Sequence, residues 1–245
     1  WITPYDPLAT NAANALQPPS WGHVFGTDQL GRDVFSRVIA ATRLDLGIAT
    51  SAVALSFVFG CALGCSAGFW GGWTDRIVGR FSDTIMAFPL FVLAMGIVAA
   101  MGNTVENIIY ATAIITLPFY ARVARAETSV RRQAGYVHAA RLCGSGNVRI
   151  LATQIFPNIL PPMMVQVSLN MGWAILNAAG LSFIGLGVRP PDAEWGIMVA
   201  EGANFIVSGE WWLAIFPGLA LMLAVFCFNL LGDGLRDLVD PQRRT

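Results

Sequence analysis

The sequence predicts an all-α, polytopic membrane protein with five transmembrane helices. Three observations carry this prediction: only 12% of the 245 residues are charged, 55% are hydrophobic, and the mean hydropathy is +0.58. Soluble globular proteins carry about 25% charged residues. A water-facing surface cannot be built from so few charges, so we expect the chain to lie in a lipid bilayer.

Five stretches contain no Asp, Glu, Arg or His and are the candidates for spans, since a hydrocarbon core of roughly 30 Å needs about 20 apolar helical residues. We expect these spans at Leu46–Trp70, Thr84–Val105, Asn107–Ala121, about Ile159–Leu181 and Trp211–Gly232. The third stretch is short, but it reaches the required length if Arg122 snorkels at its end.

The arginines predict the orientation, because cytoplasmic loops carry an excess of basic residues. All 15 basic residues are Arg. Most fall on the side that holds the C-terminus, namely Arg76, Arg80, Arg122, Arg125, Arg131, Arg132, Arg141, Arg149, Arg236, Arg243 and Arg244. The other side holds Arg32, Arg37, Arg43 and Arg189. We therefore expect an extracytoplasmic segment at 1–45, a transmembrane domain at 46–232 and a cytoplasmic tail at 233–245.

Composition argues against several classes of function. The chain has no Lys, which excludes a P-loop ATPase, whose phosphate-binding motif contains Lys, and Schiff-base lysine chemistry. A net charge of zero and a pI near 6.9 give no support to a nucleic-acid partner. Histidine occurs only at His23 and His138, so we expect no metal site. No ionisable side chain lies deep in a predicted span, which argues against an ion-coupled carrier and against an intramembrane enzyme.

Two spans carry patterned side chains. Gln166, Asn170 and Asn177 lie within about 40° of arc on one face of the fourth predicted span. They either line a transport pathway or form hydrogen bonds between helices. In the first span, glycines at Gly60, Gly64 and Gly68 predict a seam of close helix packing.

The long connection before the fourth span is polar yet has helical character. Ala139 and Ala140 lie in a short helical stretch that Gly144 would end. We expect a short helix, a glycine break and a second helix that returns to the membrane. Small alanine side chains would let a partner surface approach closely. The alternative is an ordinary solvated loop.

Four segments carry a resemblance to a known family. Tyr136-Val-His-Ala-Ala-Arg-Leu-Cys-Gly144, followed by Ile155-Phe-Pro157, resembles the EAA loop of bacterial ABC-importer permeases, with His138 where that family usually has Glu. Segments 25–37, 181–196 and 228–241 resemble signatures of the dipeptide/oligopeptide/nickel subfamily: FGTDQLGRDVFSR with Phe25 where the family has Leu, LSFIGLG with a following PP and EWG, and FNLLGDGLRD with Asp240-Pro241. The resemblance covers nearly the whole chain and is to the C-type subunit.

The resemblance implies an ABC type I importer permease fold with six transmembrane helices, so we expect the first to precede Trp1. It implies a location in the bacterial inner membrane. The partners would be a homologous B-type permease, two cytoplasmic ATPase subunits or domains and an extracytoplasmic solute-binding protein. ATP and Mg would bind to the ATPase partners, with no cofactor in this chain and no catalysis by it.

The implied function is to form half of the pathway for di- or oligopeptides. Nickel chelates, opines and glutathione are the alternatives within the family, while a passive channel and a membrane scaffold are the alternatives outside it. The loop at about 128–157 would couple the membrane helices to the ATPase. Within it, the resemblance assigns the contact to His138, Ala139, Ala140, Arg141 and Gly144.

Two extracytoplasmic segments complete the prediction. The first suggests a tight turn and a helix that begins near Leu30, with Asp28 as its cap. Its signature residues are Gly26, Thr27, Asp28, Gly31, Arg32 and Asp33. We prefer a structural role for them to contact with the binding protein or gating. The second, at about 182–210, is acidic and ends before the Trp211–Trp212 interfacial anchor; its acids would either complement the binding protein or attract cations.

Overall fold

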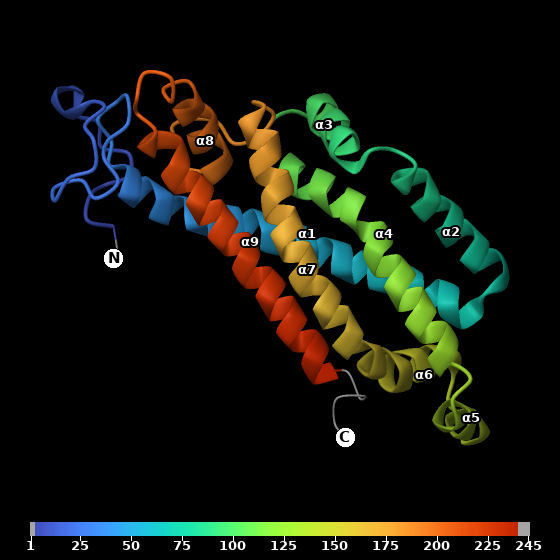
Figure 1. Ribbon diagram of the computed structural model, residues 1–245. Coiled ribbons are helices and arrows are strands. Elements are labelled where there is room, and N and C mark those ends of the chain that lie inside the picture. The colour runs from blue at the N-terminus through green and yellow to red at the C-terminus, as the bar shows by residue number, and fades with distance from the viewer. Residues whose placement is uncertain (1–2, 240–245) are drawn as a thin grey trace. The chain divides into compact units, whose positions relative to one another are not determined.

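The computed structural model describes residues 3–239, and their regular structure is helical (Figure 1). The predicted all-α class is confirmed. Trp1, Asp240–Pro241, Arg243 and Arg244, which the sequence predictions include, lie outside the described residues. The helices are η1 (Ala12–Asn14), α1 (Val34–Trp70), α2 (Gly72–Met86), α3 (Leu90–Met101), α4 (Val105–Arg131), α5 (Gly135–Leu142), α6 (Asn147–Ile150), η2 (Leu151–Ile155), α7 (Phe156–Phe183), α8 (Trp195–Ala203) and α9 (Trp212–Val239).

Within residues 3–239, four helical stretches are long and apolar enough to cross a membrane, and up to five if a bent pair counts as one span. The four are Val34–Trp70, Val105–Arg131, Asn147–Phe183 and Trp212–Leu238. They coincide with the first, third, fourth and fifth predicted spans, which confirms a polytopic protein with four or five spans.

The second predicted span, Thr84–Val105, is not one straight helix. It is divided between α2 and α3, which bend by 89° at the break between them. The break contains Phe88 and Pro89. A residue before proline is pushed out of the α region, which ends a helix at this point.

The chain forms two compact units, each made of segments that are distant in sequence. One comprises Trp1–Ser51, Ala94–Thr112 and Met171–Cys227, and the other Ala52–Leu93, Ala113–Asn170 and Phe228–Thr245. The first unit contains the predicted extracytoplasmic segment and the outer acidic loop. The second contains the predicted coupling loop.

Within the second unit, α1 packs against α4 along the predicted glycine seam. A Cβ added at Gly64 would lie 2.2 Å from the carbonyl oxygen of Ala121, and one at Gly68 would lie 2.6 Å from that of Arg125. Next to the seam, the Ser56 hydroxyl donates to the Ala113 carbonyl at 2.9 Å. The sequence prediction of close packing is confirmed, because only glycine leaves room for this approach.

Candidate functional site

The predicted coupling loop contains a short helix, α5, closed by a glycine cap. Gly144 has a φ of +79°, a region that favours glycine. Its N–H donates to the Arg141 carbonyl at 2.9 Å, and the Ser145 N–H donates to the Ala140 carbonyl at 3.0 Å. This pair of bonds is the Schellman motif, which satisfies the last carbonyls of a helix. Gly144 therefore fixes where α5 ends.

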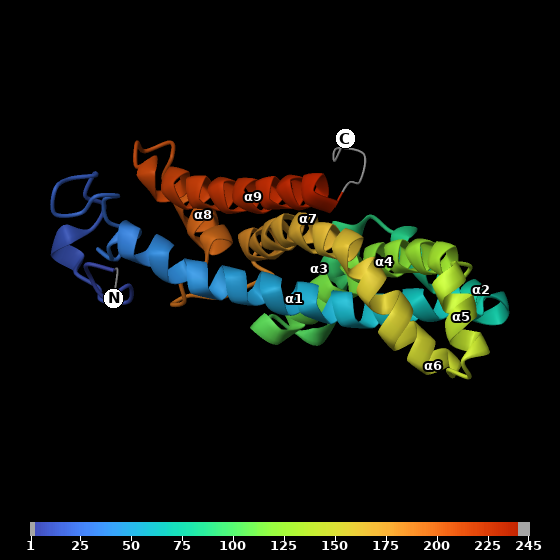
Figure 2. The same ribbon diagram turned by 90° about the horizontal axis from the view of Figure 1, so that it is seen from below.

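One side of α5 is anchored and the other is open. Val137 is completely buried, whereas His138 and Ala139 are exposed and Leu142 is 90% exposed. The next helix, α6, exposes Val148 as well. In both views α5 lies beside α6 after the end of α4 (Figures 1 and 2). Apolar side chains exposed together on a short connecting helix are typical of a surface that another protein covers.

Two arginines tie this loop to the C-terminal end of α1. Arg132 Nη1 donates to the carbonyls of Gly68 and Phe69 at 3.3 and 3.0 Å. The Arg141 guanidinium lies 5.7 Å from the centre of the Phe69 ring. Cations at the C-terminal end of a helix stabilise its unpaired carbonyls and favour its dipole. Sequence reasoning missed Arg132 as an anchor, because its partners are backbone atoms about 60 positions earlier.

The polar side chains of α7 make separate contacts in the two units. In the second unit, Gln166 Nε2 donates to Asn170 Oδ1 at 3.3 Å on the same helix face. In the first unit, Asn177 Nδ2 donates to Thr112 Oγ1 of α4 at 2.9 Å. Asn170 and Asn177 are buried, at 7% and 4% exposure. The bond made by Asn177 is of the interhelical kind that the sequence left open.

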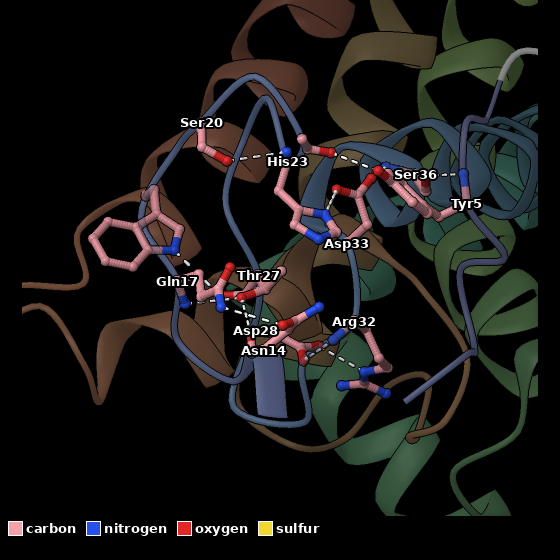
Figure 3. A network of polar contacts seen from close by, with 12 residues as sticks. Tyr5, Asn14, Gln17, Ser20, His23, Thr27, Asp28, Arg32, Asp33 and Ser36 are labelled. Atoms are coloured by element: carbon pink, nitrogen blue, oxygen red, sulfur yellow. Dashed lines mark hydrogen bonds and ion pairs between the residues drawn. The ribbon is translucent and has the colours of Figure 1, made fainter. Parts of the chain in front are cut away.

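In the first unit, the signature residues predicted to be extracytoplasmic form a buried polar network (Figure 3). Thr27 accepts from the Gln17 N–H at 2.8 Å and donates to the Asn14 carbonyl. Asp28 accepts from the backbone N–H groups of Leu30 and Arg32, both at 2.9 Å, and from Arg32 Nε at 2.6 Å. These side chains face one another, which favours the structural interpretation of the signature.

The signature requires its glycines because neighbouring backbone atoms lie against them. Gly26 and Gly31 have φ values of +73° and +70°. A Cβ at Gly31 would lie 1.8 Å from the Asn11 carbonyl oxygen, and one at Gly26 would lie 2.6 Å from that of Gln17. A side chain at either position would therefore disrupt the loop.

The helix after the signature begins later than the sequence predicted, and a different residue caps it. α1 starts at Val34 rather than near Leu30. Asp33 Oδ2 accepts from the Ser36 N–H at 2.8 Å, as an N-cap does, while Oδ1 contacts His23 Nδ1 at 2.9 Å. Asp28 instead closes the preceding turn, because Gly31 at positive φ keeps residues 28–32 out of helical geometry.

Buried charges of α1 hold the outer loop in place. Arg37 Nη1 donates to the carbonyls of Pro7 and Pro191 at 3.2 and 3.4 Å. Asp45 Oδ2 accepts from the Trp195 N–H at 3.1 Å. The sequence analysis did not single out either residue for such a role, since their partners lie far away along the chain.

The acids of the outer loop are not all free for a partner. Glu194 is fully buried and caps α8 by accepting from the Ile197 N–H at 2.7 Å. Burial raises the pKa of Glu194. Glu201 lies 3.8 Å from Arg32. Asp192 remains exposed.

No group of three or more His, Cys, Asp or Glu side chains within residues 3–239 is arranged to hold a metal ion. The first unit offers a buried polar network, and the second offers α5 with exposed side chains. Such parts can position helices and bind a partner.

Comparison with known proteins agrees with this arrangement. Residues 60–245 match the model of the family described as binding-protein-dependent transport system inner membrane component. The probable D,D-dipeptide transport system permease protein DdpC of Escherichia coli K12 is 44% identical over 99% of this chain and 81% of its own length. The glutathione transport system permease protein GsiD of Pectobacterium atrosepticum is 42% identical over 100% of this chain and 81% of its own.

Among solved structures, an inward-facing MetNI methionine ABC transporter chain superposes with a TM-score of 0.64 at 15% identity, covering 83% of this chain and 97% of that one. This likeness establishes the fold, which is that of ABC importer permeases. The family match covers most of the chain, and the relatives align with nearly all of it. The chain is therefore a multi-pass inner-membrane transport subunit and belongs to the family of binding-protein-dependent transport system inner membrane components.

Proposed function

We propose that the chain forms one half of the membrane pathway of an ATP-driven importer for di- or oligopeptides. The observation that carries the proposal is α5, a capped helix with Ala139 and Leu142 exposed, anchored by Arg132 and Arg141 to the end of α1. A helix held in this way can pass the movement of a docked partner into the membrane region.

The partners follow from this role. A homologous B-type permease would supply the other half of the pathway, and two cytoplasmic ATPase subunits or domains would bind ATP and Mg. A solute-binding protein would deliver the peptide on the extracytoplasmic side. This chain would hold no cofactor. The C-terminus and α5 would be cytoplasmic, in keeping with the arginine distribution.

Peptide as the substrate class is supported by the 44% identity to a D,D-dipeptide permease over 99% of the chain. Glutathione is the second candidate, because a glutathione permease is 42% identical. Both are peptide-like ligands. Nickel chelates and opines are further candidates that a substrate panel would separate.

The coupling contact is proposed to involve His138, Ala139, Ala140, Arg141 and Gly144. For the pathway we propose Gln166, Asn170 and Asn177. The buried contacts of Asn170 and Asn177 favour helix packing for these two. Gln166, which is half-buried, is the stronger candidate for a pathway residue.

The test is ATP hydrolysis by the reconstituted complex of full-length subunits, stimulated by its binding protein loaded with dipeptides, glutathione or nickel chelates. Ala139→Trp adds bulk to the exposed face of α5, and we expect stimulation to fall at least tenfold while assembly persists. Ala126→Trp is the matched control, since Ala126 is exposed on α4. Equal stimulation of the two variants would contradict the coupling role of α5.

Deleting residues 137–146 distinguishes an importer from a passive channel. The deletion would spare solute flux through a channel and abolish uptake by an importer.

A further inference from the structure

A polar cleft lies between α2 and α4 in the second unit. It encloses a volume of about 710 Å³. Its lining is Asp75, Arg76, Val78, Gly79, Arg80, Ser82, Asp83, Ala121, Arg122 and Arg125. Four of these side chains are basic and two are acidic.

The two acids are already paired with arginines of α4. Asp83 Oδ1 accepts from Arg122 Nη2 at 2.7 Å. Asp75 accepts from both Arg125 Nε and Arg125 Nη2, the latter at 2.7 Å. Both ion pairs join α2 to α4, and in each pair the carboxylate neutralises the charge of its arginine. They leave the charges of Arg76 and Arg80 uncompensated.

Arg76 and Arg80 are exposed on α2, and among the described residues neither has a carboxylate within ion-pair distance. The Arg76 guanidinium rests 5.3 Å from the centre of the Trp73 ring. Guanidinium groups bind phosphate oxygens through two parallel hydrogen bonds. The cleft is therefore complementary to a phosphate that approaches between α2 and α4.

The apolar surface beside this cleft narrows the choice of ligand. Trp73, Ile77 and Phe81 recur every four residues on α2 and are 76%, 65% and 47% exposed. Val78 and Ile85, about 140° and 120° around the helix from Trp73, are buried. At 100° per residue, Arg76 and Arg80 lie within about 60° of Trp73 on the helix circumference. The basic groups thus border an exposed apolar stripe.

We propose that the cleft between α2 and α4 is a binding site for an anionic phospholipid. Arg76 and Arg80 bind its phosphate, and the stripe of Trp73, Ile77 and Phe81 contacts its acyl chains. Basic pockets between helices and basic amphipathic helices bind anionic lipids by this combination. A free phosphate or nucleotide would use the arginines but would make no contact with the apolar stripe.

The test measures lipid retention by native mass spectrometry on the full-length complex in detergent. The probes are dioleoyl phosphatidylglycerol and, as the zwitterionic comparison, dioleoyl phosphatidylcholine. Each basic residue near an anionic membrane surface contributes about 1 kcal/mol, so replacing both arginines should weaken binding on the order of 25-fold. We expect that loss for R76Q/R80Q and a smaller loss for R76K/R80K, which keeps both charges but not the paired hydrogen bonds of the guanidinium groups.

The matched control is R43Q/R189Q, which removes the same charge from exposed positions outside the cleft, and it should retain the phosphatidylglycerol. Trp73→Ser should weaken retention of the lipid by severalfold. If R76Q/R80Q fails to assemble, the single pair R80Q and R80K carries the same comparison.

Three results would overturn the proposal. The first is unchanged phosphatidylglycerol affinity in R76Q/R80Q, or in R80Q where that pair is used. The second is equal affinity of the native complex for phosphatidylcholine. The third is displacement of the lipid by 50 mM inorganic phosphate together with no effect of Trp73→Ser, which would identify a site for a soluble anion.

Discussion

Gly144→Ala and Gly135→Ala make the same chemical change at the two ends of α5, with opposite expected effects. A Cβ at either position meets nothing within 4 Å, so steric contact plays no part in the comparison. Gly144 has a φ of +79°, whereas Gly135 is the first helical residue of α5. The two substitutions therefore differ in the backbone conformation that alanine must adopt.

The magnitudes follow from that difference. Placing alanine in the left-handed region costs about 1–2 kcal/mol. Replacing glycine by alanine inside a helix gains about 0.5–1 kcal/mol. Since α5 has only eight residues, an isolated helix of its length would be marginal. We expect Gly144→Ala to open the cap about tenfold more often, and Gly135→Ala to open α5 severalfold less often.

Hydrogen exchange on the full-length complex measures this opening. The N–H groups of Gly144 and Ser145 report the cap directly, because both donate to α5 carbonyls. Binding-protein-stimulated ATP hydrolysis should fall with Gly144→Ala and be retained with Gly135→Ala. Gly144→Asn should lie between Gly144→Ala and the native chain, since Asn tolerates positive φ. Equal protection of Gly144→Ala and Gly135→Ala would refute the reasoning.

Three further predictions concern stability, read from thermal unfolding of the detergent-solubilised complex. Gly64→Val should destabilise by about 1–3 kcal/mol by forcing α1 away from Ala121, whereas Gly47→Val on the same helix, where a Cβ meets nothing within 4 Å, should have little effect. Asp33→Ala should cost about 0.5–2 kcal/mol through loss of the α1 cap, with the exposed Asp192→Ala as its neutral control. Burial raises the pKa of Glu194, so the contribution of this side chain to the free energy of unfolding should be complete below the unfolded pKa of about 4.3 and should be lost as the pH rises through the folded pKa. Glu194→Gln should flatten this dependence of stability on pH. An unchanged pH profile in the variant would contradict the prediction.

The spans were largely predictable, because a stretch without charges is both the signal and the physical requirement for crossing a bilayer. The break at Phe88–Pro89 was not, since a search for charge-free stretches ignores backbone geometry. The apolar composition runs through this break without interruption. Pro89 is its visible sign, and the effect of proline on the preceding residue is local enough to be used in prediction.

That one helix, α1, runs from Val34 through the first predicted span was missed for the opposite reason. Arg37 and Asp45 were treated as charges that keep a segment out of the membrane helix, yet both lie inside α1. The free-energy cost of burying these two charges is offset by hydrogen bonds, which Arg37 donates to the carbonyls of Pro7 and Pro191 and which Asp45 accepts from the Trp195 N–H. These partners lie up to 154 positions away, so no local pattern identifies them.

Hydrogen bonds within the fold also decide which of the acids predicted to be extracytoplasmic are available to a partner. Glu194 and Asp33 each accept a backbone N–H at a helix N-terminus, and the Asp28 carboxylate accepts from two. A carboxylate used in this way stabilises its own helix or turn, and a partner that drew it away would leave buried N–H groups unpaired. The acidic character of these segments therefore overstates the charge that would be available to the proposed binding protein. Exposed acids such as Asp192 are the ones whose charge a partner can meet without unfolding the loop.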